Sequence, residues 1–256
     1  MTGAAEPSLP AFSARPRFLP SGTQPWGVVA AIAIAAFAAY GARDGMNGAT
    51  HHFPAGEVWN ALRHVLVWGA PLAVIVAGVR LTQIPLRDYL GWTMPRPTDL
   101  ALGLVLAVAV GLLPNLLQWA VTGKPVTAHQ IADYRNAIAA GWSNPGLVFA
   151  AWPWLLLVPL VEETVFRGFL WRSFVARLGH VGTLLATALL FTAIHYPQAI
   201  MPNGSFNEWP LIDHFIGGCA LGAMRWRSGT STVPIVMHAW LNIWVAIAVM
   251  VLLPLM

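Results

Sequence analysis

Charged residues are scarce in this chain of 256 amino acids. Only 9% are Asp, Glu, Lys or Arg, whereas 57% are hydrophobic and the mean hydropathy is +0.63. Soluble domains contain about 25% charged residues, and a single core of this size cannot hide so much apolar surface. The composition therefore excludes an ordinary soluble domain and predicts an integral membrane protein whose surroundings are lipid.

Cysteine is also scarce, and no cleavable leader is expected. Cys219 is the single cysteine, so an internal disulfide is excluded. Residues 1–25 are rich in Pro, Ser and Gly and hold no apolar segment with a cleavage site, which predicts a disordered tail and no signal peptide. The pI of about 9.8 does not indicate nucleic-acid binding, because the basic residues form short clusters between apolar runs.

Long apolar runs are frequent, and they predict about seven transmembrane helices. A membrane helix needs about 20 mostly apolar residues. Runs of this kind cover residues 26–41, 61–79, 99–121, 146–166, 181–200, 211–224 and 233–254. The expected fold is therefore all-α, a polytopic helix bundle in which residues 26–256 form a single transmembrane domain.

Basic residues are shared unevenly between the two ends of these spans. One side has ten: Arg15, Arg17, Arg80, Arg87, Arg96, Arg167, Arg172, Arg177, Arg225 and Arg227. The other side has three: Arg43, Lys124 and Arg135. Because basic residues concentrate in cytoplasmic loops, this bias predicts a cytoplasmic N-terminus. The excess of arginine over lysine, with much alanine, favours a GC-rich bacterial genome and hence the bacterial inner (plasma) membrane.

Ionisable groups also occur inside the predicted spans, where insertion scales put the cost of a charge at about 2.5–3.5 kcal/mol. The stretch EETVFR puts Glu163 and Arg167 four residues apart, on one helix face where they can pair. Glu162 points about 100° away around the helix. One carboxylate can thus be held by the arginine while the other stays free.

Two later spans carry polar residues at the same helical spacing. FTAIH contains Phe191 and His195, and HAWLN contains His238 and Asn242. A carboxylate in a low-dielectric site can act as a general base toward water, and a histidine beside it can share that water. A second histidine and an amide can donate hydrogen bonds to a developing oxyanion. The same groups could instead bind zinc, relay protons in a transporter, or lock helices together as a structural cluster.

The three stretches resemble, in order and spacing, the Glu-Glu-x-x-x-Arg, Phe-x-x-x-His and His-x-x-x-Asn motifs of the CAAX prenyl protease and bacteriocin-processing family of intramembrane proteases. The resemblance covers residues 146–245 and implies a catalytic core made from the last four spans. It implies roles for residues of all three motifs: water activation by Glu162 with His195, an oxyanion hole of His238 and Asn242, and support from Glu163, Arg167 and Phe191.

The function that this resemblance implies is an intramembrane endopeptidase acting on a membrane-anchored peptide or a protein C-terminal tail. No metal cofactor is favoured, although a zinc ion, if bound, would take Glu162, His195 and His238. The alternatives are a zinc-dependent metalloprotease, a transporter, or a non-catalytic scaffold or immunity protein. No motif position is lost and no repeated halves are visible, which disfavours the last two.

The depths of these residues impose a condition on the fold. If the fourth span ended at residue 166, Glu162 and His238 would lie near the inner face of the membrane, whereas His195 would lie roughly 20 Å from that face. We therefore expect a continuous helix over about 147–177, which buries Arg167 against Glu163. Three smaller expectations complete the prediction: close helix packing at Gly218 and Gly222, an interfacial position for Asp213 and His214, and a solvated loop at His51 and His52.

Overall fold

The chain is all-α in the computed structural model, which describes residues 25–54, 56–123, 152–200 and 204–252. Residues 1–24 of the predicted tail and 146–151 of the fourth predicted span lie outside these ranges. The first predicted span is a rod made of α1 (Val28–Ala36), the π-helical η1 (Phe37–Ala42) and α2 (Arg43–Ala49). It was predicted to end at residue 41, which is wrong, because the helix continues through Arg43.

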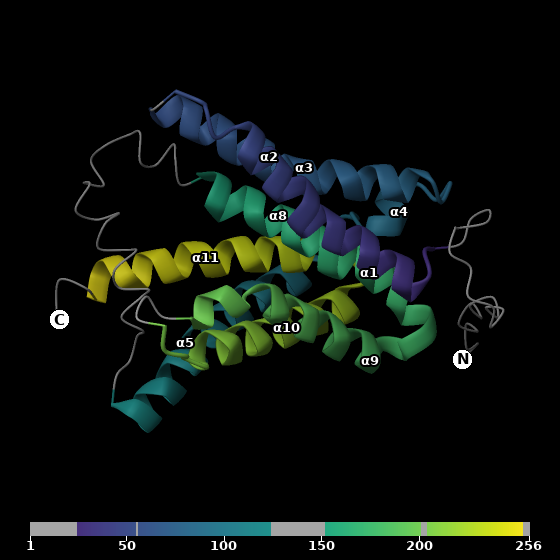
Figure 1. Ribbon diagram of the computed structural model, residues 1–256. Coiled ribbons are helices and arrows are strands. Elements are labelled where there is room, and N and C mark those ends of the chain that lie inside the picture. The colour runs from purple at the N-terminus through teal and green to yellow at the C-terminus, as the bar shows by residue number, and fades with distance from the viewer. Residues whose placement is uncertain (1–24, 55, 124–151, 201–203, 253–256) are drawn as a thin grey trace, which may run out of the picture.

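The remaining spans follow in the predicted order (Figure 1). The elements after the first rod are α3 (Glu57–Arg80), the unpredicted short α4 (Leu86–Leu90), α5 (Pro97–Thr122), η2 (Pro153–Leu157), α8 (Val158–Glu163), η3 (Thr164–Leu170), α9 (Trp171–Ile194), η4 (Tyr196–Ala199), α10 (Trp209–Ser228) and α11 (Thr232–Leu252). Each predicted span coincides with a helix as far as the described residues reach.

Several helices are long and apolar enough to cross a membrane. Among the described residues these are Val28–Ala49, Val58–Arg80, Pro97–Thr122 and Leu155–Ile194, and Thr232–Ile243 is a shorter apolar helix. Large apolar side chains such as Leu112, Leu116 and Val121 on α5 are exposed, as lipid-facing side chains are. The structure therefore confirms a helical membrane bundle.

The fourth and fifth spans form one helical hairpin. Helix runs without interruption from residue 152 to Leu178, which confirms the expected continuous helix over its described part. The break comes at Gly179, whose φ of 62° and ψ of −178° suit a residue without Cβ. The chain then folds back on itself, and as a result the ring of Phe191 lies 5.4 Å from the ring of Phe166. Helix α9 ends at Ile194, so the predicted end at residue 200 is wrong.

Hydrogen bonds tie several helix ends together at one end of the bundle, which we call the arginine-rich end because Arg80, Arg87, Arg96, Arg225 and Arg227 lie there. The backbone N–H of Trp26 donates to the Tyr89 hydroxyl, which also contacts the Ser173 hydroxyl at 3.0 Å. Burial raises the pKa of Tyr89, so this hydroxyl stays protonated. The turn between α10 and α11 binds the α4 loop through Thr230 Oγ1 and the carbonyl of Gly91.

Candidate active site

Four ionisable side chains from two helices form a buried cluster in the bundle. Glu162 and Glu163 end α8, Arg167 lies in the π-helical η3 that follows, and His238 lies two turns into α11. Glu163 and Arg167 are completely buried, whereas Glu162 and His238 each keep 7% of their surface exposed. π-helical turns inside α-helices are frequent at functional sites.

Arg167 is the centre of this cluster. Its Nη1 donates to Oε1 of Glu163 at 3.0 Å, and its Nη2 donates to the carbonyl of Gly218 at 2.7 Å. The guanidinium carbon also lies 4.9 Å from the centre of the Phe191 ring. The predicted pairing with Glu163 is confirmed. Because Arg167 and Arg225 are both buried, they leave the predicted cytoplasmic count, which becomes eight basic residues against three.

His238 joins the two glutamates. Its Nδ1 lies 2.9 Å from Oε1 of Glu163. A carboxylate paired with an arginine is ionised and can only accept, so Nδ1 of His238 is the donor. The other ring nitrogen, Nε2, lies 4.0 Å from Oε2 of Glu162. The imidazole is therefore held from one side by Glu163 and presents its second nitrogen to Glu162.

The two adjacent glutamates differ in their bonding. Glu163 accepts charge-assisted hydrogen bonds from Arg167 and His238. Glu162 makes no hydrogen bond within the part of the chain that the structure describes, and its polar contact there is His238 at 4.0 Å. One carboxylate is held and the other is not, which is the arrangement that the sequence spacing predicts.

The second motif lies beside this cluster, around the ring of Phe191. His195 follows the last residue of α9, and its Nδ1 contacts the carbonyl of Phe191 at 2.8 Å. The Phe191 ring lies 4.6 Å from the His195 ring and 5.9 Å from the His238 ring. Among the described residues His195 has no contact with Glu162 within 4.0 Å, so its predicted role as the partner of Glu162 stays a prediction. Asn242 is half-buried, one turn beyond His238 on α11.

Several residues that hold the site were missed or misplaced by the sequence analysis. Arg225, predicted to lie in a cytoplasmic loop, is buried, and its Nε donates to the carbonyl of Arg167 at 2.8 Å. The Ser231 hydroxyl contacts the same carbonyl and that of Leu90. A charge inside the apolar run GCALGAMR was the available signal for Arg225, but no local pattern indicated Ser231.

Helix α10 approaches α9 closely, as the predicted small-residue pair requires. A Cβ added at Gly218 would lie 3.2 Å from Ala188, and one at Gly222 would lie 3.1 Å from Leu184. This approach brings the Gly218 carbonyl to Arg167. It also brings His214, expected at the interface, into a stack on His195 with ring centres 3.9 Å apart.

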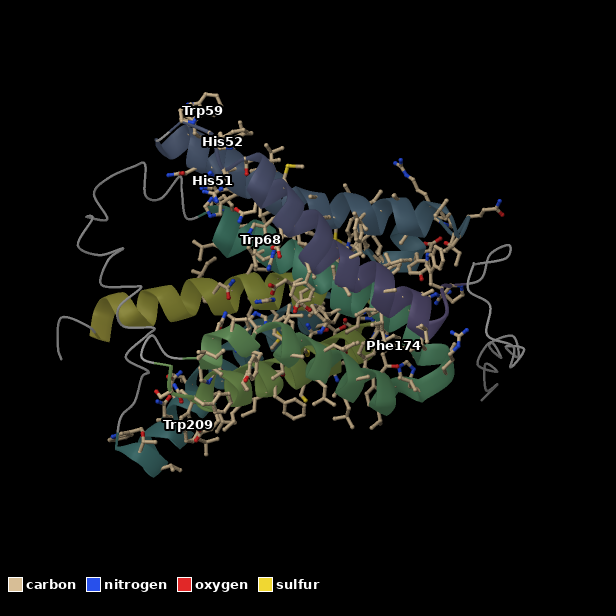
Figure 2. All side chains as sticks on the ribbon, viewed as in Figure 1. His51, His52, Trp59, Trp68, Phe174 and Trp209 are labelled. Carbon is tan, nitrogen blue, oxygen red and sulfur yellow. The ribbon has the colours of Figure 1, made fainter. Side chains whose placement is uncertain are left out.

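A zinc centre was the alternative use of these residues. No three His, Cys, Asp or Glu side chains converge as metal ligands in the described ranges, and Glu162, His195 and His238 form no such set. That the protein needs no metal stays a prediction. His51 and His52 follow the end of α2 (Figure 2), and both are exposed, as expected for a solvated loop.

Comparison with known proteins finds a family that part of the chain resembles. Residues 144–244 match the family described as Rce1-like, type II CAAX prenyl endopeptidase Rce1-like. No curated protein and no solved structure matches the chain. The matched segment holds all three motifs, from Glu162 to Asn242, so the resemblance inferred from them is confirmed. Residues 144–244 of this membrane protein are thus similar to the CAAX prenyl endopeptidase family, a family of peptidases.

Proposed function

We propose that this protein is an intramembrane endopeptidase in which Glu162 activates water for attack on a peptide bond. The observation that carries the proposal is the unequal bonding of two adjacent buried carboxylates, within the segment that matches a peptidase family. Glu163 is neutralised by Arg167 and has a structural task. Glu162 lies beside a histidine nitrogen with its lone pairs available, which is what a general base needs.

The distance between Glu162 and His238 suits an intervening water. At 4.0 Å, Oε2 and Nε2 are too far apart for a direct hydrogen bond, whose length is about 2.7–3.2 Å. A water that bridges the two atoms can make a good hydrogen bond to each. Glu162 takes a proton from this water, the oxygen adds to the peptide carbonyl carbon, and the proton is then delivered to the departing amine nitrogen.

Stabilisation of the oxyanion is assigned to the third motif, following the family resemblance. Asn242 donates from its neutral amide, one helical turn from His238. The resemblance assigns His238 to the same oxyanion hole, and its ring is held in place by the hydrogen bond between Nδ1 and Glu163. His195 is assigned to share the attacking water with Glu162.

The proposed substrate is a membrane-anchored peptide or the C-terminal tail of a membrane protein, without a prenyl group. The cluster lies inside a bundle whose outer surface is apolar, so a substrate embedded in lipid is the kind that reaches it. We further propose the bacterial inner membrane as the location, with the arginine-rich end in the cytoplasm. The grouping of basic residues at that end supports this orientation.

The test compares purified wild type with Glu162→Gln in liposomes. The substrates are an internally quenched single-span peptide with a C-terminal tail and a farnesylated C-terminal peptide. Loss of the general base is expected to lower kcat/KM by about 100- to 10,000-fold. Glu208→Gln, at an exposed glutamate outside the cluster, is the matched control and should cleave like wild type.

Two results would contradict the proposal. Cleavage by Glu162→Gln at the wild-type rate would remove Glu162 from the chemistry, and absence of cleavage of both substrates by wild type would contradict the endopeptidase assignment. A chelator arm tests the cofactor prediction. We expect activity to persist in phenanthroline, and loss that zinc restores would instead establish a metalloprotease.

A further inference from the structure

His214 belongs to none of the three motifs, yet its ring lies against a motif residue. It is half-buried on the first turns of α10 and stacks on His195 with a centroid distance of 3.9 Å and an interplanar angle of 24°. The Phe191 ring is 5.9 Å away, so the two histidines and this phenylalanine form one aromatic group. We propose that His214 is a positioning residue of the active site, which holds the ring of His195 in its working orientation.

His195 needs such support because of where it lies. It is the first residue after α9, with φ −94° and ψ 4°, and the chain leaves it in the turn η4. A single hydrogen bond ties the ring to its own helix, from Nδ1 to the carbonyl of Phe191. That bond fixes which nitrogen is engaged, but the plane of the ring depends on the rings beside it, and among the described residues these include Phe191 on the same helix and His214 on the next.

His214 is itself well fixed. Its Nδ1 contacts the carbonyl of Pro210, one turn earlier in α10. Helix α10 is held close to α9 because Gly218 and Gly222 let the two backbones approach. The ring that supports His195 is therefore anchored to a rigid helix and does not depend on substrate for its orientation. The two rings are stacked nearly parallel, and aromatic rings in contact attract each other.

The two helices offer a matched control for the stack. His180 on α9 stacks on Trp226 on α10, with centroids 5.1 Å apart and planes 5° apart, at the arginine-rich end. Removing the His180 side chain weakens the packing of α9 against α10 at a place outside the three motifs. His180→Ala therefore reports the effect of losing one histidine stack between α9 and α10 without touching the active site.

The experiment measures kcat, KM and thermal stability for His214→Ala, His214→Phe and His180→Ala. We expect His214→Ala to lower kcat by about 10- to 100-fold with KM nearly unchanged, since a displacement of about 1 Å can cost that much. His214→Phe keeps a flat ring and should retain kcat within about 3-fold. Because His214 acts through His195, adding His214→Ala to His195→Ala should cause no further loss.

This inference rests on the proposed function, so a second readout separates their failures. Carbethoxylation of His195 by diethyl pyrocarbonate, followed by mass spectrometry, needs no substrate. We expect the reaction to be faster in His214→Ala than in wild type and unchanged in His214→Phe. Wild-type kcat in His214→Ala, loss of kcat in His214→Phe equal to that in His214→Ala, or unchanged reactivity of His195 would each overturn the proposal. An inactive wild type with the expected His195 reactivity would overturn only the endopeptidase assignment.

Discussion

Arg167→Met is expected to lower the free energy of unfolding by about 3–5 kcal/mol, because it leaves the completely buried carboxylate of Glu163 without its counter-ion. Arg167 donates hydrogen bonds of 3.0 Å to Glu163 and 2.7 Å to Gly218. Bonds that involve a charged group contribute about 1.5–3 kcal/mol each. Water cannot replace them, since neither Glu163 nor Arg167 has exposed surface.

The double mutant separates the pair from its packing. Methionine has an unbranched, adaptable side chain, so most of the loss in Arg167→Met should come from the unpaired charge. Glu163→Gln removes that charge while its amide oxygen still accepts from His238. In Glu163→Gln with Arg167→Met, we therefore expect recovery of about 1–3 kcal/mol relative to the sum of the single losses.

Unfolding by sodium dodecyl sulfate in mixed micelles, followed by far-UV circular dichroism, measures these free energies. Arg172→Met is the control, because Arg172 is exposed five residues further along the same helix, and surface changes stay within about 0.5 kcal/mol. The reasoning is wrong if Arg167→Met costs less than about 1 kcal/mol. It is equally wrong if the losses of the single mutants simply add in the double mutant.

Two glycine pairs test the backbone contacts that support the site. Gly218→Ala puts a methyl group 3.2 Å from the α9 backbone and should cost about 1–3 kcal/mol in thermal unfolding, whereas Gly217→Ala meets only ordinary contact and should be neutral or stabilising. Equal stability of these two variants would contradict the packing described. Gly91→Ala and Gly229→Ala share a φ near +70°, but only the first places a Cβ against the guanidinium of Arg225, at 2.7 Å. Gly91→Ala should therefore be the less stable of the two and should also lose activity, and the reverse order would refute that contact.

Much of the site could be predicted because its parts are local in sequence. The spacing of Glu163 and Arg167 is a property of one helix, so their pairing followed from helix geometry alone. The same geometry required the fourth helix to continue past Arg167, and it does so to Leu178. Helix ends were less accurate: Arg43 was placed in a loop, because its charge interrupts an apolar run that the helix nevertheless continues through.

The sequence by itself determined the membrane class, the order of the helices and the three motifs, since composition and helical spacing depend only on neighbours along the chain. Tertiary structure alone decided which groups of different helices meet. The bonds from Arg167 to Gly218 and from Arg225 to Arg167 join residues 51 and 58 positions apart. His238 reaches Glu163 across 75 positions, and the stack of His214 on His195 depends on how closely α10 approaches α9. The pair Gly218 and Gly222 predicts that α10 packs closely on a neighbour, but nothing in the spacing along one helix tells which side chains of the other helices it meets.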